Sequence, residues 1–292
     1  MTLVTGATGN VGKPLAGLLA QAGVPFKAFV RNPGRARSAL GSGVDLVEGD
    51  FSTPASLEAT LGGVDRLFLL SGNPRHEGNA IDAAARSGVG RIVKQSALAT
   101  GLKPPAFHRQ IEEKIERSGL GYTHLRPTAF MQTLMGYLPA LIDAEGVFRL
   151  PAGSGRIAWV DTRDIAAVAF RALTEEGHDG KAYPITGPAS LSMVEIAERL
   201  SAATGRRLRY ENAAPEEAHE MVERGLPPSM ADFLISFYGS VRGGETDFVT
   251  DTVPEVSGEP GRTFDRFARE QASAFEAVAG SKTEVDSSSD SG

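Results

Sequence analysis

The chain has 292 residues, of which 41% are hydrophobic and 23% charged, and its formal net charge is −6. The acidic balance, without a long basic run, argues against nucleic-acid binding. The lack of cysteine excludes disulfides and thiolate chemistry, and we predict no metal site. No apolar run is long enough to span a membrane and the first residues resemble a strand, so we expect a cytoplasmic protein without a membrane partner.

The first half of the chain alternates between short apolar runs and amphipathic helical patterns. We expect strands at 2–5, 25–30, 44–47, 64–70, 91–95 and 122–125, and helices at 11–22, 36–40, 56–61, 79–87 and 107–118. Strands that alternate with helices through short connections predict an α/β fold in which a doubly wound parallel sheet is covered by helices on both faces.

The second half is less regular. We expect a long apolar helix at 130–142, a strand at 157–160, a helix at 162–173, a strand at 182–185, a helix at 192–204 and further helical structure within 211–250. From about residue 280 the tail is polar and lacks apolar anchors, which predicts disorder over 280–292.

The first predicted strand runs into the segment TGATGNVG, with glycines at positions 6, 9 and 12. Gly6 permits a tight turn, Gly9 lets the backbone approach a pyrophosphate, and Gly12 lets the helix pack closely. The helix N-terminus offers free N–H groups and a positive dipole end to phosphates. Strand, turn and helix together predict a dinucleotide site over Gly6, Thr8, Gly9, Asn10, Val11 and Gly12; the alternative is a turn that binds nothing.

The residue that ends the second predicted strand indicates which dinucleotide binds. An acidic residue there would accept from a ribose 2′-OH, but this chain has Arg31, and a guanidinium suits a 2′-phosphate. We therefore predict NADP(H) in preference to NAD(H), although Arg31 as a solvated surface residue is the alternative. Asp50 and Phe51 follow the third strand, where we expect the adenine to bind; a role for Asp50 in capping the strand end is the alternative.

Several segments together resemble the NmrA-like branch of the atypical short-chain dehydrogenases. They are TGATGNVG, VRNP, EGDF, SALA, HRQIEEKIERSGLGYTHLRPTAFMQTL, WVDTRDIA and YPITGPASLSMVEIAERLSAATGR, spread over about residues 1–270. The branch includes type-2 NAD(P)H:quinone oxidoreductases, triphenylmethane reductases and redox-sensing regulators. The resemblance implies a Rossmann domain at 1–150 and a smaller, mostly helical substrate domain at 188–279. Residues 157–187 would either return to the Rossmann domain or bridge the two lobes.

The same resemblance places further residues at the cofactor. Ser71, Gly72 and Ser96 lie at the ends of predicted strands, where open α/β sheets bind their ligands, and Pro127 lies in the segment that would pass the nicotinamide. Phe130 and Leu134 would face the substrate, although core packing explains such residues equally well.

Classical short-chain dehydrogenases use a Tyr-x-x-x-Lys pair to protonate the nascent alkoxide. Pro104 occupies the tyrosine position in this chain and His108 the lysine position. Reduction of a quinone yields a far weaker base than reduction of a ketone, and it needs no such acid. His108 is our only catalytic candidate, and a plain helix-start histidine is its alternative.

We therefore expect an NADPH-dependent oxidoreductase that acts on a quinone or a similar planar, aromatic small molecule. The alternatives are a non-catalytic NADP(H)-sensing regulator and a ketone or imine reductase of secondary metabolism. The sequence leaves the oligomeric state open.

Overall fold

The computed structural model describes residues 1–98, 102–214, 217 and 227–275. Its backbone forms two compact units. The first comprises 1–128, 162–186 and 250–261, and the second comprises 129–161, 187–249 and 262–292. The sequence places its domain boundaries near residues 150 and 188, whereas these backbone units change over at Thr128. The predicted disordered tail at 280–292 and part of 211–250 lie outside the described residues.

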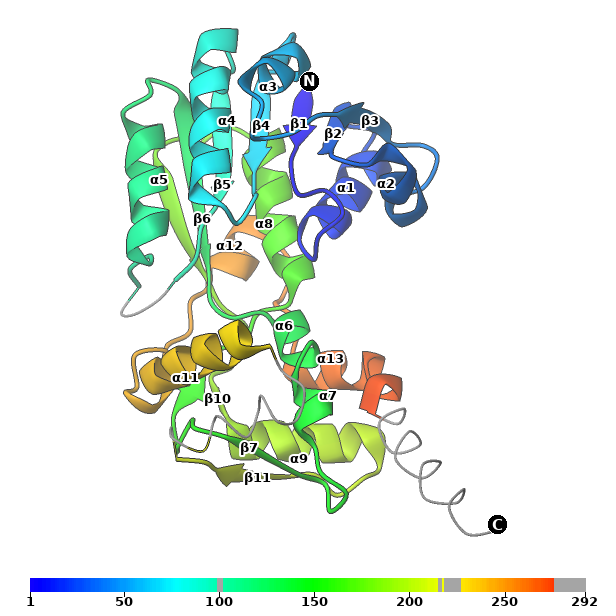
Figure 1. Cartoon of the computed structure of the whole chain (residues 1–292), viewed down its shortest axis with the longest axis vertical. Coiled ribbons are helices and arrows are strands. Elements are labelled where there is room, and N and C mark those ends of the chain that lie inside the picture. Colours follow the sequence, from blue (N-terminus) through cyan, green and yellow to red (C-terminus); the bar gives the residue numbers. More distant parts are fainter. Residues whose placement is uncertain (99–101, 215–216, 218–226, 276–292) are drawn as a thin grey trace, which may run out of the picture. The chain divides into compact units, whose positions relative to one another are not determined.

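The first unit contains a seven-stranded sheet in which every neighbouring pair is parallel (Figure 1). Its order is β3-β2-β1-β4-β5-β6-β9. Strands are added outward on one side of β1 up to β3 and then on the other side from β4 onward, and folds of this kind bind their ligands at that switch point between β1 and β4. The strands are β1 (Thr2–Val4), β2 (Phe26–Val30), β3 (Asp45–Glu48), β4 (Arg66–Leu69), β5 (Arg91–Gln95), β6 (Gly121–Pro127) and β9 (Lys181–Ile185). This arrangement confirms the predicted doubly wound α/β fold.

Two groups of helices flank this sheet (Figure 1). One group is α3 (Pro54–Leu61), α4 (Pro74–Ser87) and α5 (Ala106–Glu116), and the other is α1 (Gly12–Gln21), α8 (Thr162–Thr174) and α12 (Thr252–Ser257). The apolar faces of the first group enclose, against the sheet, a core that contains Leu3, Leu67 and Ile92 from the strands and Leu57 and Ile81 from the helices. Burial of these side chains drives the packing of helix on sheet.

Helices α2 (Pro33–Leu40) and α4 begin earlier than the predicted positions 36 and 79. The side chain of Asn32 accepts a hydrogen bond from the backbone N–H of Arg35, and that of Asn73 accepts from the N–H of His76. Proline follows each asparagine at the first helical position, where its missing N–H costs nothing. Cap chemistry therefore extended both helices into segments predicted as loops.

The second unit has two short sheets. β7 (Val147–Leu150) pairs in parallel with β11 (Arg209–Asn212), and β8 (Arg156–Ile157) pairs antiparallel with β10 (Leu191–Ser192). Its helices are α6 (Met131–Met135), α7 (Leu138–Leu141), α9 (Met193–Thr204), α11 (Pro228–Arg242) and α13 (Phe264–Glu270). Trp159, Tyr238, Phe148 and Phe267 are fully buried in the core of this unit.

Two predictions for this unit were wrong. The long helix at 130–142 is two short helices, α6 and α7, because Pro139 lacks an N–H and cannot continue a helix from the preceding turn. The strand at 157–160 is confined to Arg156–Ile157. Helix α11 confirms the further helical structure predicted within 211–250, but the end of strand β11 at the start of that region was not predicted, because the local pattern does not encode its pairing with β7.

Among the described residues, no helix has the length and apolar character needed to cross a membrane.

Candidate functional site

The glycine turn joins β1 to α1, and its geometry requires glycine. Gly6 has φ +62°, a left-handed conformation that side chains disfavour. A Cβ at Gly12 would lie 2.1 Å from the carbonyl oxygen of Gly6 and 2.7 Å from the Cα of Ala7. Gly12 therefore lets the helix close onto the backbone of its own turn. The sequence predicted that Gly12 lets α1 pack closely, and the structure shows that α1 packs there against the backbone of Gly6 and Ala7.

The N-terminal end of α1 is free to accept an anion. Its cap residue Val11 offers no side-chain hydrogen bond, and the first turn carries no acidic residue. Thr8, Gly9 and Asn10 are exposed, and a Cβ at Gly9 would meet only the Gly6 carbonyl, at 3.2 Å. The N–H of Lys13 already donates to the Gly9 carbonyl at 3.0 Å and Pro14 has no N–H, so the groups left for the diphosphate of a dinucleotide are the N–H groups of Asn10, Val11 and Gly12.

The turn is fixed to the neighbouring strand by Thr5. Its hydroxyl donates to the carbonyls of Phe68 and Leu70 at 2.9 and 3.1 Å and accepts from the N–H of Leu70 at 2.8 Å. This buried hydroxyl therefore joins the ends of β1 and β4, the two strands at the topological switch point.

Arg31 directly follows β2 and is exposed. No hydrogen bond or ion pair joins its side chain to any residue of the described ranges. Its guanidinium is therefore available to a ligand, as the predicted contact with a 2′-phosphate requires.

Asp50 is already engaged within its own loop. Its Oδ1 accepts from the N–H and the hydroxyl of Ser52, both at 2.7 Å. These bonds lower the pKa of the Asp50 carboxyl, with smaller contributions from the charges of His76 and Arg31. One carboxylate oxygen holds the loop, which leaves the other for the predicted contact with adenine.

Phe51 is half-buried, with its ring packed edge-on against Phe29 at 5.0 Å between centroids. The ring of His76 lies parallel to Phe51, at 5.8 Å. Asn79 donates to the Phe51 carbonyl at 2.9 Å and so ties α4 to this loop. The sequence reasoning had not placed His76 beside Phe51, because the two come from separate elements.

The remaining predicted cofactor residues lie at the ends of β4, β5 and β6. Ser71 and Gly72 follow β4, and Gly72 has φ +70°. Ser96 follows β5 and donates its N–H to the carbonyl of Leu125 at 2.7 Å. Pro127 ends β6 and accepts at 2.8 Å from the N–H of Leu98. These residues therefore share one edge of the sheet.

His108 lies in the first turn of α5 and is partly buried. Its Nδ1 has no hydrogen-bond partner among the described residues. Burial, and secondly the charge of Lys94, lower its pKa to about 4. The imidazole is therefore neutral near pH 7.

The sequence reasoning missed a buried ion pair beside these residues. Lys94 on β5 and Glu77 on α4 are 0% and 2% exposed, and the Lys94 Nζ lies 3.1 Å from a carboxylate oxygen of Glu77. Burial lowers the pKa of Lys94, and the Glu77 charge opposes that effect. A single lysine within the apolar run RIVKQ was the available signal.

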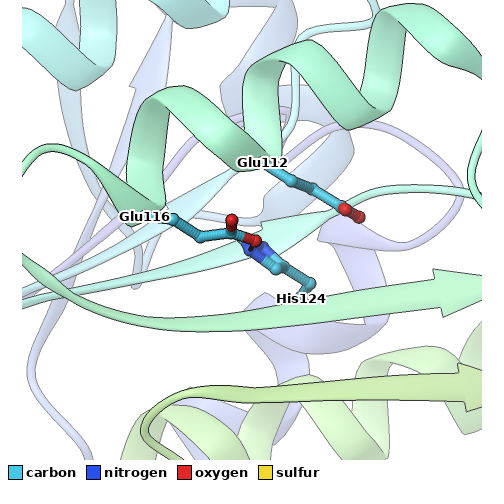
Figure 2. A group of neighbouring side chains, drawn as sticks. All are labelled: Glu112, Glu116 and His124. Atoms are coloured by element: carbon cyan, nitrogen blue, oxygen red, sulfur yellow. Dashed lines mark hydrogen bonds and ion pairs between the residues drawn. The ribbon is translucent and has the colours of Figure 1, made fainter.

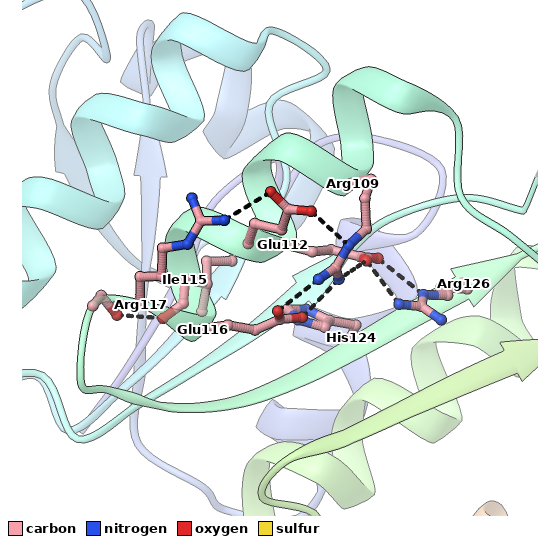
Figure 3. A network of polar contacts seen from close by, with 9 residues as sticks. Arg109, Glu112, Ile115, Glu116, Arg117, His124 and Arg126 are labelled. Atoms are coloured by element: carbon pink, nitrogen blue, oxygen red, sulfur yellow. Dashed lines mark hydrogen bonds and ion pairs between the residues drawn. The ribbon is translucent and has the colours of Figure 1, made fainter.

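Glu112, Glu116 and His124 lie close together between α5 and β6 (Figure 2). Their potential ligand atoms are within 4.8 Å of one another. Figure 3 shows, however, that the carboxylate oxygens are already hydrogen-bonded to arginines. Arg126 donates to both oxygens of Glu112 at 3.0 and 2.8 Å, and Arg109 donates to both oxygens of Glu116 at 2.7 Å. The cluster is therefore a network of ion pairs that joins α5 to β6.

The predicted substrate residues belong to the second unit. Phe130 is half-buried and pairs through its backbone with Val160. Leu134 is fully buried within the core of that unit, between α6 and its neighbours.

Comparison with known proteins identifies the family. The model of the NmrA-like family matches residues 1–248. The chain belongs to the NmrA-like family. It is 39% identical to an NAD(P)H azoreductase from Xenophilus azovorans, an alignment that covers 95% of this chain and 100% of that protein. It is 32% identical to quinone oxidoreductase 2 from Escherichia coli, over 90% and 96% of the two chains.

A solved structure gives the same result for the fold. The NADPH-dependent quinone oxidoreductase from Escherichia coli, in complex with NADPH, superposes with a TM-score of 0.85 at 29% identity. The superposition covers 92% of this chain and 99% of that one.

Proposed function

We propose that this protein transfers hydride from NADPH to a quinone or a similar planar, electron-poor acceptor. The observation that carries the proposal is the glycine turn. At Gly12 a Cβ would lie 2.1 Å from the Gly6 carbonyl, and the α1 N-terminus beside it carries neither a side-chain cap nor an acidic residue. A turn that demands glycine and leaves a helix start free is typical of a dinucleotide diphosphate site.

The class of enzyme rests on the relatives. The azoreductase is named for NAD(P)H, and the quinone oxidoreductase from Escherichia coli for its acceptor. Each match extends over at least 90% of this chain. The chain is accordingly an NAD(P)H-dependent oxidoreductase. Bound NAD(P)H supplies the hydride, and the protein supplies binding, orientation and electrostatics.

Arg31 supports NADPH over NADH. It occupies the position after β2 where an acidic residue would select the ribose 2′-OH, and its guanidinium is exposed. Lys13, exposed in the first turn of α1, adds a second positive charge to the region of the diphosphate.

The neutral state of His108 supports an acceptor that needs no strong acid. Ketone reduction leaves an alkoxide, which requires a positioned proton donor. A pKa of about 4 removes His108 as a cationic acid at neutral pH, and Pro104 occupies the position of the classical tyrosine. A reduced quinone spreads its charge over the ring and takes its proton from water. Proximity and orientation are then sufficient for hydride transfer.

The test is an acceptor panel with the purified protein and NADPH. Benzoquinones and naphthoquinones form the main arm, azo dyes the second, and simple aromatic ketones and imines the third; loss of the nicotinamide absorbance is followed in each. We expect oxidation with quinones and none with ketones. Turnover confined to ketones or imines would favour the biosynthetic reductase. NADPH binding without any turnover would favour the sensing protein.

A further inference from the structure

A buried chain of polar contacts joins the ends of β4 and β5. The N–H of Ser71 donates to Oε1 of Glu77 at 3.1 Å. The same oxygen lies 3.1 Å from Nζ of Lys94, and Nζ also donates to the carbonyl of Gln95. Ser71 is the second residue after β4 and Gln95 is the last residue of β5, so two side chains connect two strand ends.

The peptide between Gln95 and Ser96 is held from both sides. Its carbonyl accepts from Lys94, and its N–H donates to the carbonyl of Leu125 at 2.7 Å. Because a peptide is planar, these two contacts set the direction in which Ser96 leaves the strand. On the other side, the N–H of Ser71 is fixed by Glu77, just before Gly72 turns with φ +70°.

The attraction between Lys94 and Glu77 does not by itself explain why both charges are buried. Lys94 and Glu77 are 0% and 2% exposed, and burying two charges costs about as much as their attraction returns. Apolar residues of similar volume, such as Val93 on the same strand, would fill the space but would leave the Ser71 N–H and the Gln95 carbonyl without the partners that Glu77 and Lys94 supply. Retention of both charges beside the predicted cofactor residues is explained by the contacts that they make with the two strand ends.

We propose that Lys94 and Glu77 are positioning residues that hold the β4 and β5 ends in place for the nicotinamide half of the cofactor. The inference rests on the proposed NAD(P)H site and is independent of which acceptor is reduced. The adenosine half, at Arg31 and Asp50, has no contact with this pair among the described residues. The clamp, defined as Ser71, Glu77, Lys94 and Gln95, therefore acts on one half of the ligand.

The lysine charge also reaches the catalytic candidate. Lys94 contributes to the lowered pKa of His108, and the Nδ1 of that histidine has no partner in the described ranges. The clamp thus lies between the strand ends and the start of α5 without contacting the reacting atoms itself.

The experiment uses the full chain with Lys94→Met and Glu77→Leu combined, which replaces the pair by apolar side chains of similar size and keeps the core filled. Two ligands are titrated by fluorescence or calorimetry: NADPH, and 2′,5′-ADP, which occupies only the adenosine half. We expect the Kd for NADPH to rise by about ten-fold, the equivalent of one lost charged hydrogen bond, with the Kd for 2′,5′-ADP unchanged. Equal weakening of both ligands, or of neither, would overturn the proposal.

A second measurement reads the clamp without any cofactor. Hydrogen exchange of the Ser71 amide should accelerate in the double variant, because that N–H loses its acceptor. The matched control is Lys114→Met with Asp82→Leu, an exposed pair at 2.8 Å between α5 and α4. It should change neither the exchange rate nor either Kd. If the native protein binds NADPH but reduces no acceptor, the proposed function fails and the clamp stands. Unchanged exchange in the double variant refutes the clamp alone.

Discussion

The glycine turn and the ends of β4 and β5 belong to the same sheet but are built by different physical means. At the turn, the absence of side chains makes the site: a Cβ at Gly12 would collide with the Gly6 carbonyl, and Gly6 itself has a left-handed φ of +62°. At the β4 and β5 ends, buried charge makes it, since Lys94 and Glu77 hold the backbone through their side chains. The first kind of site is encoded by residues that are close together in the sequence. The second forms only when folding brings Glu77 and Lys94 together.

The largest expected effect tests the glycine turn. Gly12→Val should abolish measurable NADPH binding and destabilise the fold by about 1–3 kcal/mol or more, because its Cβ would overlap the Gly6 carbonyl. Kd by fluorescence and the free energy of unfolding in urea check this. Gly17→Ala is the control: it lies in the same helix with nothing within 4 Å of its Cβ. It should bind normally and gain up to about 1 kcal/mol. Full binding by Gly12→Val would contradict the interpretation.

The next effect tests buried charge at α5. Glu112 is fully buried, and although burial raises its pKa, the hydrogen bonds and positive charges around it, those of Arg126 foremost, together outweigh that effect and leave the pKa lowered. Glu112→Gln should cost about 3–5 kcal/mol of unfolding free energy, since it leaves guanidinium charge without its counterion. Glu113→Gln, one residue along and 36% exposed, should cost about 0–1 kcal/mol. A similar loss for both variants would show that burial is not what matters here.

A smaller effect tests the adenosine end. Arg31→Ala should weaken NADPH binding by about 10- to 100-fold, the range for a charged hydrogen bond, and leave NADH binding unchanged. Separate titrations with the two cofactors measure the ratio. Arg117→Ala, at an exposed arginine that directly follows α5, controls for the general change of charge. If NADH binds the native protein more tightly than NADPH, the assignment of Arg31 is wrong.

The smallest effect concerns pH. His108 has a folded pKa of about 4 against an ordinary value of 6.5, so between these values the unfolded chain binds more protons and stability falls with falling pH. His108→Gln should reduce that slope and leave stability above pH 6.5 little changed. Urea unfolding at several pH values in this range measures it. His124 and His178, whose pKa values are also lowered, keep part of the slope. An unchanged slope would argue against a buried neutral His108.

Much of the first unit could be predicted because its signals are local. Apolar runs between helical patterns predicted all seven strands of the parallel sheet to within two residues at each end. The glycine spacing predicted the position of the turn, and the end of the second apolar run predicted that Arg31 follows β2. Helix starts were less accurate, since Asn32 and Asn73 cap helices that open on proline.

The second unit was predicted less well because its small sheets depend on distant partners. β7 and β11 pair over about 60 residues of chain, and two-residue strands such as β8 have no periodicity to detect. Hydrophobicity alone predicted one continuous helix at 130–142, but Pro139 divides this segment into α6 and α7.

The sequence by itself determined the fold of the first unit, the glycine turn and the position of Arg31 directly after β2, because hydrophobic periodicity and backbone sterics act between near neighbours. Only the tertiary structure decided that Lys94 meets Glu77, that Glu112 is neutralised by Arg126, and that His108 is buried beside a positive charge. Charge and burial depend on what folding brings together from separate helices and strands, and no spacing along the chain encodes that.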